Sequence, residues 1–295
     1  MTSLKIAIAI ATAGRRDLLA QTVRFIARQT RLPNELLICP AKADDFDAGC
    51  LDGFPASARV VPGSIGSSAQ RNALIEATNC DVIVFFDDDF LPAEDFLEET
   101  ERIFANNLNV AIVTGEVLAD GAVGPGLDFE NAVSIIAQAG VNDASATLRP
   151  VFNGYGCNMA ARMTLIRRNH IRFDENLPLY AWLEDVDFSR QLAPFGDIVR
   201  ASRLRGVHMG TKRSGRTPGR RLGYSQVANQ VYLMRKWNMS ASSTFAWVMR
   251  NVLANLARSF LPEPWVDRRG RLTGNMLAFW DLVRGRVDPR RMLDL

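Results

Sequence analysis

The sequence predicts an α/β fold with a mostly parallel central sheet flanked by helices, followed by a helical C-terminal extension. Short apolar runs rich in β-branched residues alternate with amphipathic helical segments over the first 116 residues. This alternation is typical of parallel βαβ units with right-handed crossovers. Beyond residue 222, helical patterns follow one another without strand signals between them. The chain has 295 residues, of which 47% are hydrophobic, and this length allows either one large domain or a domain with an appendage.

The first half of the chain provides the expected strands and helices in order. A polar turn separates a strand over residues 5–10 from a helix over residues 18–29, whose apolar residues recur at helical spacing. Pro33 breaks the chain before a strand over residues 35–39. The other predicted elements are strands over residues 59–61, 82–86 and 110–116 and helices over residues 69–77, 92–104 and 131–139, with Pro92 opening the second of these helices.

The second half is predicted to be irregular before it becomes helical. Residues 152–161 are small and Gly-rich, which would let the backbone approach a ligand closely. A helix is expected to begin within residues 182–190. Residues 211–222 combine basic side chains with chain breakers and predict a mobile basic loop. Helices over residues 223–237 and 244–260 follow it.

The cysteine content and the length of the apolar runs indicate in which cellular compartment the protein is expected. The four cysteines are scattered without a Cys-x-x-Cys pair, so structural zinc or a disulfide framework is not expected and a reducing cytoplasm fits best. No apolar run reaches the roughly 18 residues that a membrane-spanning helix needs. We therefore expect a cytoplasmic protein, and a peripheral position at the inner face of the plasma membrane stays open.

Charge is distributed unevenly. Residues 1–195 hold 16 Lys and Arg against 26 Asp and Glu, whereas residues 196–295 hold 19 against 6. A basic C-terminal third favours an anionic partner: a phosphate-bearing substrate, an anionic membrane surface or nucleic acid. The alternative is a contact in which the acidic and basic parts neutralise each other.

Three consecutive carboxylates follow the strand over residues 82–86. Adjacent acids repel each other and are costly to desolvate, so a fold rarely places three together at a strand end without a counter-charge. Mg²⁺ and Mn²⁺ prefer oxygen ligands and bridge carboxylates to phosphates. Asp87, Asp88 and Asp89 therefore predict a metal-diphosphate site at the carboxyl end of the strand, where open α/β sheets bind ligands. An acidic turn with Asp89 as a helix N-cap is the alternative.

Seven short motifs occur in an order that resembles the family 2 glycosyltransferases of bacterial polysaccharide and glycolipid synthesis, which have the GT-A fold. The motifs are Thr12-x-x-x-Arg16, Gln70-Arg-Asn-Ala73, Phe86-Asp-Asp-Asp89, Gly156-Cys-Asn-Met-Ala160, Phe173-Asp-Glu175, Glu184-Asp185 and Val207-His208. The resemblance covers about residues 4–210. It implies a metal-dependent, inverting transfer of a single sugar from a nucleotide-diphosphate sugar to an acceptor hydroxyl.

The resemblance also implies a division of the chain. A GT-A catalytic domain would occupy residues 1–210, and the loop over residues 211–222 would connect it to a helical extension. The implied parts are a nucleotide-binding half (1–116), an acceptor half (117–210), the loop (211–222) and the extension (223–295).

The resemblance assigns roles in the metal site, which would hold Mn²⁺ or Mg²⁺. Asp89 would bind the cation directly, and Asp87 would hold the ribose or bind the cation through water. Asp88 takes the variable middle position of the motif. His208 matches a late metal-ligand position, although a structural role is the alternative for a lone histidine.

Asp185 is the candidate general base, because an inverting transfer needs a carboxylate that takes the proton of the attacking hydroxyl. Its place at a helix start would help to keep it ionised. Glu184 would orient the acceptor. The alternative is that Glu184, Asp185 and Asp187 only cap the helix.

For the donor, Arg71 would place its guanidinium near the diphosphate, and Thr12 and Ala13 would contact the nucleobase. The further candidates for nucleotide-sugar binding are Arg16, Asp87, Asp88, Gly156 and Asn158. The family's second strand usually ends in an acid that holds the base, but residues 37–40 contain none. The nucleobase therefore stays open, with UDP the commonest choice in the family.

The implied acceptor is a saccharide or a lipid-linked saccharide, and nucleic acid is not expected as a partner. The helix over residues 244–260 places its apolar residues on one stripe. Packing on the catalytic domain is one explanation. Peripheral contact with an anionic membrane is the other, supported by Trp247, Trp265 and Trp280.

Two rival functions fit parts of the pattern. A sugar nucleotidyltransferase would need a Gly-rich phosphate loop after the first strand, but residues 12–16 contain one glycine. A carbohydrate- or phosphate-binding protein that kept the fold and lost turnover is the other rival. The presence of all the expected catalytic acids argues against it.

Overall fold

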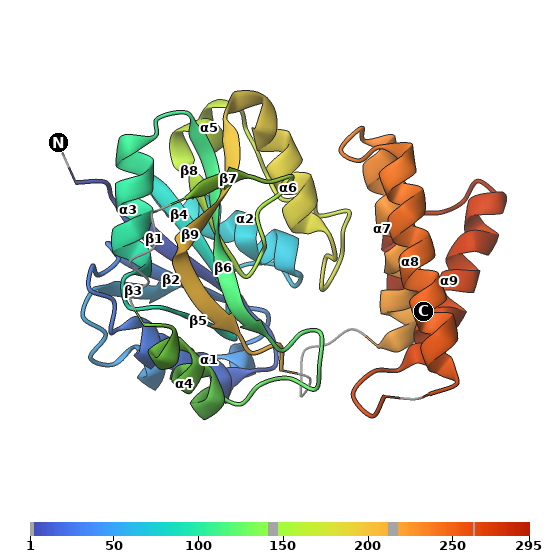
Figure 1. The fold of residues 1–295 in the computed structure, drawn as a ribbon, viewed down its shortest axis with the longest axis horizontal. Coiled ribbons are helices and arrows are strands. Elements are labelled where there is room, and N and C mark those ends of the chain that lie inside the picture. Colours follow the sequence, from blue (N-terminus) through green and yellow to red (C-terminus); the bar gives the residue numbers. More distant parts are fainter. Residues whose placement is uncertain (1–2, 141–146, 212–217, 262) are drawn as a thin grey trace. The chain divides into compact units, whose positions relative to one another are not determined.

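The computed structural model describes residues 3–140, 147–211, 218–261 and 263–295. The chain divides into two compact units (Figure 1). Unit 1 comprises Met1–Ile65, Ala69–Phe173 and Phe188–Gly215, and unit 2 comprises Gly66–Ser68, Asp174–Asp187 and Arg216–Leu295. The division into a domain over residues 1–210 and an extension over residues 223–295 stays a prediction.

Unit 1 is built on one mixed sheet with the strand order β3-β2-β1-β4-β8-β6-β9-β5, in which β7 pairs with β9 off this path. The strands are β1 (Ile6–Thr12), β2 (Glu35–Pro40), β3 (Ser57–Val60), β4 (Val82–Asp87), β5 (Phe90–Pro92), β6 (Val110–Asp120), β7 (Leu148–Pro150), β8 (Asn158–Arg162) and β9 (Asp197–His208). The helices associated with this sheet are α1 (Arg16–Ile26), α2 (Ser67–Ala77), α3 (Phe96–Asn106), α4 (Phe129–Ala139), α5 (Met163–Arg168) and α6 (Glu184–Leu192).

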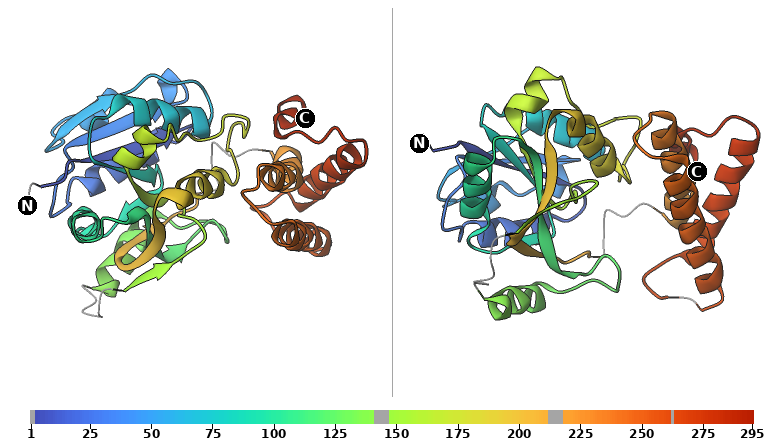
Figure 2. Two further views of the ribbon diagram at one scale, coloured as in Figure 1. Left: turned by 90° about the horizontal axis from the view of Figure 1, so that it is seen from above. Right: turned by 45° about the horizontal axis from the view of Figure 1, so that its top comes forward.

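The predicted alternation of strands and helices is confirmed for the first four strands of this order. β3, β2, β1 and β4 pair in parallel. The residues of β1, β2 and β4 are mostly buried on both faces, which helices cover, whereas the edge strand β3 is largely exposed. α1 and α3 pack on one face of the sheet, while α2 and α5 pack on the other (Figure 2).

The other half of the sheet is mixed. β8 lies between β4 and β6 and runs antiparallel to both, so β6 is not the direct neighbour of β4. Four of the five residues of β8 fall within residues 152–161, the segment predicted only as small and Gly-rich. Such a short run carries no periodicity that separates a strand from a loop.

The helix predicted over residues 92–104 begins later than expected. Pro92 ends β5, and α3 starts at Phe96. Pro92 is tolerated there because β5 is the last strand in the sheet order, and an edge strand does not need every N–H for pairing. β5 pairs antiparallel with β9, which places Phe90 opposite His208.

Unit 2 is mainly a helical bundle of α7 (Gly219–Arg235), α8 (Ala241–Ser259) and α9 (Arg268–Val283). The two helices predicted over residues 223–237 and 244–260 are present, each beginning three or four residues earlier. α7 and α9 approach closely where each has a glycine. A Cβ on Gly223 would lie 2.0 Å from the carbonyl oxygen of Arg271, and a Cβ on Gly274 would lie 2.0 Å from that of Arg220. The chain also contains short 3₁₀ turns at Ala43–Asp45, Ala48–Leu51, Ala193–Phe195 and Pro289–Asp294.

The loop predicted over residues 211–222 is only partly testable, since residues 212–217 lie outside the described residues. Residues 219–222 form the first turn of α7 and are not loop. Pro218 directly precedes this helix, where its missing N–H costs nothing. In the described part of the chain, no helix combines the length and the apolar character that crossing a bilayer requires.

Candidate functional site

The acidic triplet lies at the turn between β4 and β5. Phe86 and Phe90 flank it, and their buried rings stack with centroids 5.3 Å apart. Both ends of the turn are therefore anchored in the core, which limits the positions that the three carboxylates can take. The turn follows the carboxyl end of β4, next to the end of the parallel strand β1.

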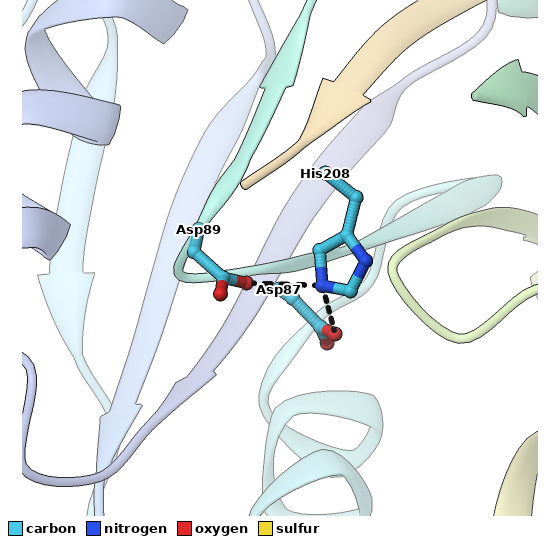
Figure 3. Close-up of side chains that lie close together, drawn as sticks. All are labelled: Asp87, Asp89 and His208. Atoms are coloured by element: carbon cyan, nitrogen blue, oxygen red, sulfur yellow. Dashed lines mark ion pairs between the residues drawn. The ribbon is translucent and has the colours of Figure 1, made fainter. Parts of the chain in front are cut away.

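β9 brings His208 to these acids, as Figure 3 shows. Nε2 of His208 lies 3.3 Å from Oδ1 of Asp89 and 3.9 Å from Oδ2 of Asp87. One ligand atom from each of the three residues lies within 4.8 Å of the others. His208, about 120 residues away in the sequence, thus lies close to Asp87 and Asp89, and the sequence motifs single out all three as metal ligands. Two carboxylates with one imidazole suit Mn²⁺ or Mg²⁺.

The two oxygens of Asp89 have different surroundings, and the difference fits a bound cation. Oδ2 pairs with Nη1 of Arg15 at 2.9 Å and accepts hydrogen bonds from N and Oγ1 of Thr211 at 3.1 and 3.2 Å. Oδ1 is buried and, apart from its ion-pair distance to His208, has no hydrogen-bond partner among the described residues. A buried carboxylate oxygen without a hydrogen bond is costly. A cation held between Asp87, Asp89 and His208 would remove that cost.

The pKa values reflect this concentration of charge. Burial raises the pKa of Asp88 to about 6 against the attraction of Arg15. Burial also acts to raise the pKa of Asp89, but His208, Arg15 and Thr211 outweigh it and hold that pKa well below its usual range. Burial acts to lower the pKa of His208, yet its contacts with Asp120 and Asp89 raise it to about 10.

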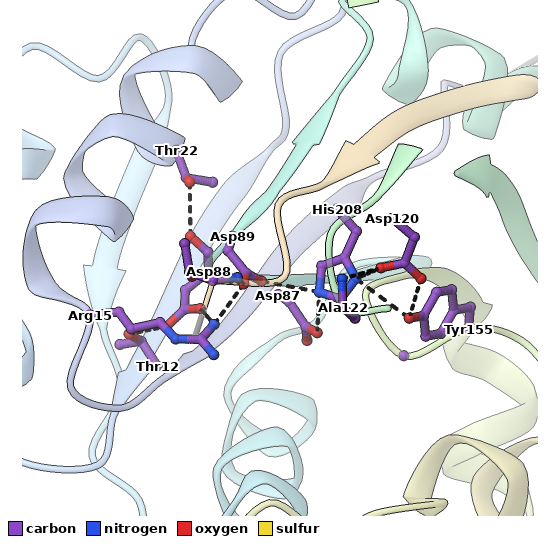
Figure 4. Close-up of polar contacts among 12 residues, drawn as sticks. Thr12, Arg15, Thr22, Asp87, Asp88, Asp89, Asp120, Ala122, Tyr155 and His208 are labelled. Atoms are coloured by element: carbon purple, nitrogen blue, oxygen red, sulfur yellow. Dashed lines mark hydrogen bonds and ion pairs between the residues drawn. The ribbon is translucent and has the colours of Figure 1, made fainter. Parts of the chain in front are cut away.

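Arg15 supplies the counter-charge that three adjacent acids require (Figure 4). Its Nη1 lies 2.8 Å from Oδ1 of Asp88 and 2.9 Å from Oδ2 of Asp89. Thr12, at the end of β1, donates through Oγ1 to Oδ2 of Asp88 at 2.7 Å. Asp88 is therefore held by β1 and by the turn that follows it, and it lies outside the three-residue cluster that could hold a metal.

The sequence motif points to Arg16 and misses its neighbour. In the structure Arg16 pairs with Asp47 at 2.7 Å, and both side chains are about half exposed. Arg15 precedes α1 whereas Arg16 is its first residue, so only Arg15 reaches the acids. Arg15 could have been predicted as a candidate from the sequence, because three adjacent acids after β4 need a basic residue and the neighbouring strand β1 is followed by Arg15. The role of Arg16 in donor binding stays a prediction, as does that of Ala13, which follows β1 at the same edge.

Arg71 contacts the acidic turn from α2. Its Nη2 donates to Oδ1 of Asp87 at 2.9 Å and to the carbonyl oxygen of Gly156 at 3.1 Å. Three predicted residues thus meet at one point. Asn158 is instead buried in β8, where its Oδ1 accepts a hydrogen bond from Oγ1 of Thr114 at 2.6 Å. The contacts of Arg71, Gly156 and Asn158 with a donor stay predictions.

Asp120 orients His208, and no motif singles it out. Its Oδ1 lies 2.9 Å from Nδ1 of His208 and accepts a hydrogen bond from the backbone N–H of Ala122, while its Oδ2 accepts one from the hydroxyl of Tyr155 at 3.0 Å (Figure 4). When Nδ1–H is donated to Asp120, the neutral imidazole presents the Nε2 lone pair toward Asp87 and Asp89. Asp120 and His208 are opposite each other where β6 and β9 pair, so only the sheet register reveals the contact.

Glu184 and Asp185 lie in unit 2, in the first turn of α6. Oδ1 of Asp185 accepts a hydrogen bond from the backbone N–H of Val186 at 2.8 Å. Asp187 is fully buried and pairs with Nζ of Lys236 at 2.7 Å. This contact gives Asp187 a structural role within unit 2, while the roles of Glu184 and Asp185 in catalysis stay predictions.

Three of the solved structures with a similar fold come from two different proteins. The mannosyltransferase PcManGT from Pyrobaculum calidifontis, in complex with GDP-Man and Mn²⁺, aligns with a TM-score of 0.61 and 14% identity over 95% of this chain and 88% of that chain. S. aureus TarS 1-349, in complex with UDP-GlcNAc, gives a TM-score of 0.52 and 13% identity over 87% and 73%. Another crystal structure of S. aureus TarS gives 0.50 and 13% over 77% of this chain and only 40% of that chain.

At 13 and 14% identity these similarities establish the fold alone. No curated protein matches this chain. A family model described as glycosyltransferase like family 2 matches residues 4–168, which is more than half of the chain and includes the acidic turn. The fold is therefore of the GT-A type, and the chain belongs to glycosyltransferase like family 2.

Proposed function

We propose that this protein is a metal-dependent, inverting glycosyltransferase that moves a single sugar, of hexosyl type, from a nucleotide-diphosphate sugar to an acceptor hydroxyl. The observation that carries the proposal is the cluster of Asp87, Asp89 and His208 at the carboxyl end of β4. Within it, Oδ1 of Asp89 is buried and, apart from Nε2 of His208 at 3.3 Å, has no hydrogen-bond partner among the described residues. Family membership supports the reaction class, and the cluster supports the use of a cation.

Asp87, Asp89 and His208 would hold Mn²⁺ or Mg²⁺. A cation bound there would neutralise the charge that develops on the diphosphate as the glycosidic bond breaks. Arg15 restrains the carboxylates of Asp88 and Asp89, and Arg71 restrains that of Asp87. The presence of Mn²⁺ with PcManGT supports the choice of metal.

The donor would be a nucleotide-diphosphate sugar, with UDP as the expected nucleotide. PcManGT was solved with GDP-Man and TarS with UDP-GlcNAc, so similar folds accept different nucleobases. β2 ends at Pro40 without an acid that could hold the base. The proposed donor contacts are those of Thr12, Ala13, Arg16, Arg71, Asp87, Asp88, Gly156 and Asn158.

Asp185 would act as the general base, and Glu184 would orient the acceptor. The acceptor oxygen forms a bond to the anomeric carbon while the bond from that carbon to the diphosphate oxygen breaks, and the hydroxyl proton passes to the Asp185 carboxylate. Attack from the face opposite the diphosphate inverts the anomeric configuration. The first turn of a helix favours an ionised carboxylate at this position.

The acceptor would be a saccharide or a lipid-linked saccharide in surface polysaccharide or glycolipid synthesis, and the protein would act in the cytoplasm or at the inner face of the plasma membrane. The basic balance of residues 196–295, 19 Lys and Arg against 6 Asp and Glu, supports an anionic partner.

A panel of nucleotide diphosphates and their sugars, with and without Mn²⁺, tests the proposal. At least one nucleotide diphosphate should raise the melting temperature only when Mn²⁺ is present, and the matching sugar nucleotide should be hydrolysed or transferred. Asp89→Asn should lose both effects, while Glu76→Gln, a change in an exposed acid of α2, should keep them. The absence of both hydrolysis and transfer across the panel would instead support a binding protein without turnover.

A further inference from the structure

The apolar stripe of α8 is buried along one edge and exposed along the other. Val248 and Val252 face the core of unit 2. Four other members of the predicted stripe are exposed to solvent: Phe245 by 68%, Leu253 by 54%, Leu256 by 43% and Phe260 by 77%. These four lie within roughly 80° of one another around the helix, given 3.6 residues per turn. We call them the exposed α8 stripe.

Two further exposed apolar residues lie close in sequence to the ends of α8. Leu261, the next residue after Phe260, is 78% exposed. On the N-terminal side, Trp237 precedes the helix and is 94% exposed, with a φ of 65° that a tryptophan rarely adopts. Single exposed apolar side chains are ordinary, but a continuous row along one helix marks a surface that another body covers.

The charges beside the stripe are basic. Residues 241–261 contain Arg250 and Arg258 and no acidic residue. The guanidinium of Arg250 lies 5.6 Å from the ring centroid of Trp247, while Arg258 pairs with Glu263 at 3.2 Å. Aromatic and leucine side chains on one face with arginines beside them are typical of helices that lie in the plane of a membrane interface.

Two other occupants fit less well. A second copy of the chain, meeting stripe to stripe, would bring the arginines of two like-charged helices together. The described residues of unit 1 have exposed large apolar side chains only in loops, strands and one 3₁₀ turn, so no α-helix there presents a matching row.

We propose that the exposed α8 stripe is a docking surface for an anionic lipid bilayer. Phe245, Leu253, Leu256 and Phe260 enter the boundary between headgroups and acyl chains, and Arg250 binds lipid phosphates. This rests on the proposed function, because the docking surface would place the enzyme where lipid-linked acceptors are found.

Sedimentation of the full-length protein with vesicles tests the docking surface. One vesicle population is phosphatidylcholine alone and the other contains about one third phosphatidylglycerol. The protein should sediment with the anionic vesicles, and Leu256→Glu with Phe260→Glu should reduce the bound fraction at least tenfold. Because both side chains are exposed, the double variant should melt like the unchanged protein. Leu108→Glu, which changes an 80% exposed residue of unit 1, is the matched control and should bind normally.

Further measurements separate the outcomes. Arg250→Gln should reduce the preference for anionic over neutral vesicles at least threefold. Failure of the unchanged protein to bind either vesicle would overturn the proposal, as would equal binding by the double variant. Light scattering that shows a dimer dissolved by Leu256→Glu would assign the stripe to a second copy. Donor hydrolysis without vesicles should be normal in the double variant, so loss of docking is distinguishable from loss of the proposed chemistry.

Discussion

Oδ1 of Asp120 lies 2.9 Å from Nδ1 of His208, and the same carboxylate accepts a hydrogen bond from the hydroxyl of Tyr155. The contact sets which ring nitrogen of His208 faces the acidic turn. A carboxylate in this position raises the basicity of a metal-binding imidazole and restrains its orientation.

Asp120→Ala should therefore weaken Mn²⁺ binding about 10- to 100-fold. Titration calorimetry or the electron paramagnetic resonance signal of free Mn²⁺ measures the affinity without any need for turnover. Tyr155→Phe should have a smaller effect in the same direction, and Glu130→Ala, a change in an exposed acid of α4, should have none. Undiminished affinity in a folded Asp120→Ala protein would show that His208 needs no such partner.

Arg15 and Arg16 offer a matched pair of substitutions at adjacent positions. Arg15→Ala leaves Asp88 and Asp89 buried without their guanidinium partner, and it should lower the free energy of unfolding by about 3 kcal/mol. Arg16→Ala removes only the half-exposed pair with Asp47, which solvent screens, and should have a much smaller effect. Urea unfolding of the two variants measures the difference, and equal losses would contradict the assignment of the counter-charge to Arg15.

Asp185→Asn should reduce sugar transfer about 10²- to 10⁴-fold while donor affinity stays nearly normal, because the base acts on the acceptor and not on the nucleotide. Transfer assays with the sugar nucleotide found in the panel, together with its dissociation constant, separate the two effects. Glu76→Gln alters an exposed acid outside the family motifs and serves as the control. Persisting transfer would place the base on another residue.

Lys236 makes the stability of unit 2 depend on pH. Burial acts to raise the pKa of Asp174, but the ion pair with Lys236 and hydrogen bonds from Asn176 and Tyr232 lower it. An acid whose folded-state pKa is depressed contributes stability above its unfolded pKa of about 3.9 and loses it as the pH falls through the folded-state value. Stability should therefore decline as the pH is lowered from about 5 toward 2.

Lys236→Met should flatten that decline and also lower stability at pH 7 by roughly 2 to 4 kcal/mol, since it leaves the buried Asp187 without its cation. Thermal melts of both proteins at pH 7, 5 and 3 give the comparison. An identical pH dependence in the variant would mean that other acids govern the acid sensitivity.

Gly223→Ala should destabilise the helical bundle by several kcal/mol, since a Cβ would lie 2.0 Å from the carbonyl oxygen of Arg271 and force α7 and α9 apart. Gly124→Ala is the matched control, because a Cβ there meets no atom within 4 Å. Chemical unfolding followed by circular dichroism compares the two. A stable Gly223→Ala protein would show that the helices can separate at little cost.

Local patterns were sufficient to predict the parallel strands and the acidic turn, and the family resemblance implied the grouping of Asp87, Asp89 and His208. They could not predict Asp120, because its importance arises from the register of β6 against β9. Nor could they distinguish Arg15 from Arg16. Arg15 precedes α1 and Arg16 is its first residue, so the two side chains point in different directions. β8 was missed because its antiparallel insertion between β4 and β6 is decided by the whole sheet.

The carboxylate of Asp89 interacts with two different parts of the molecule. Its Oδ1 faces the ligand cluster, and its Oδ2 holds Thr211, the last residue described before the chain enters unit 2. Any change in the charge of this carboxylate therefore affects both the affinity for a cation and the hydrogen bonds that hold the backbone at Thr211. An Asp89 variant therefore loses both cation binding and the contact with Thr211. Thr211→Val keeps the carboxylate and removes only the hydroxyl donor, so it separates the two losses.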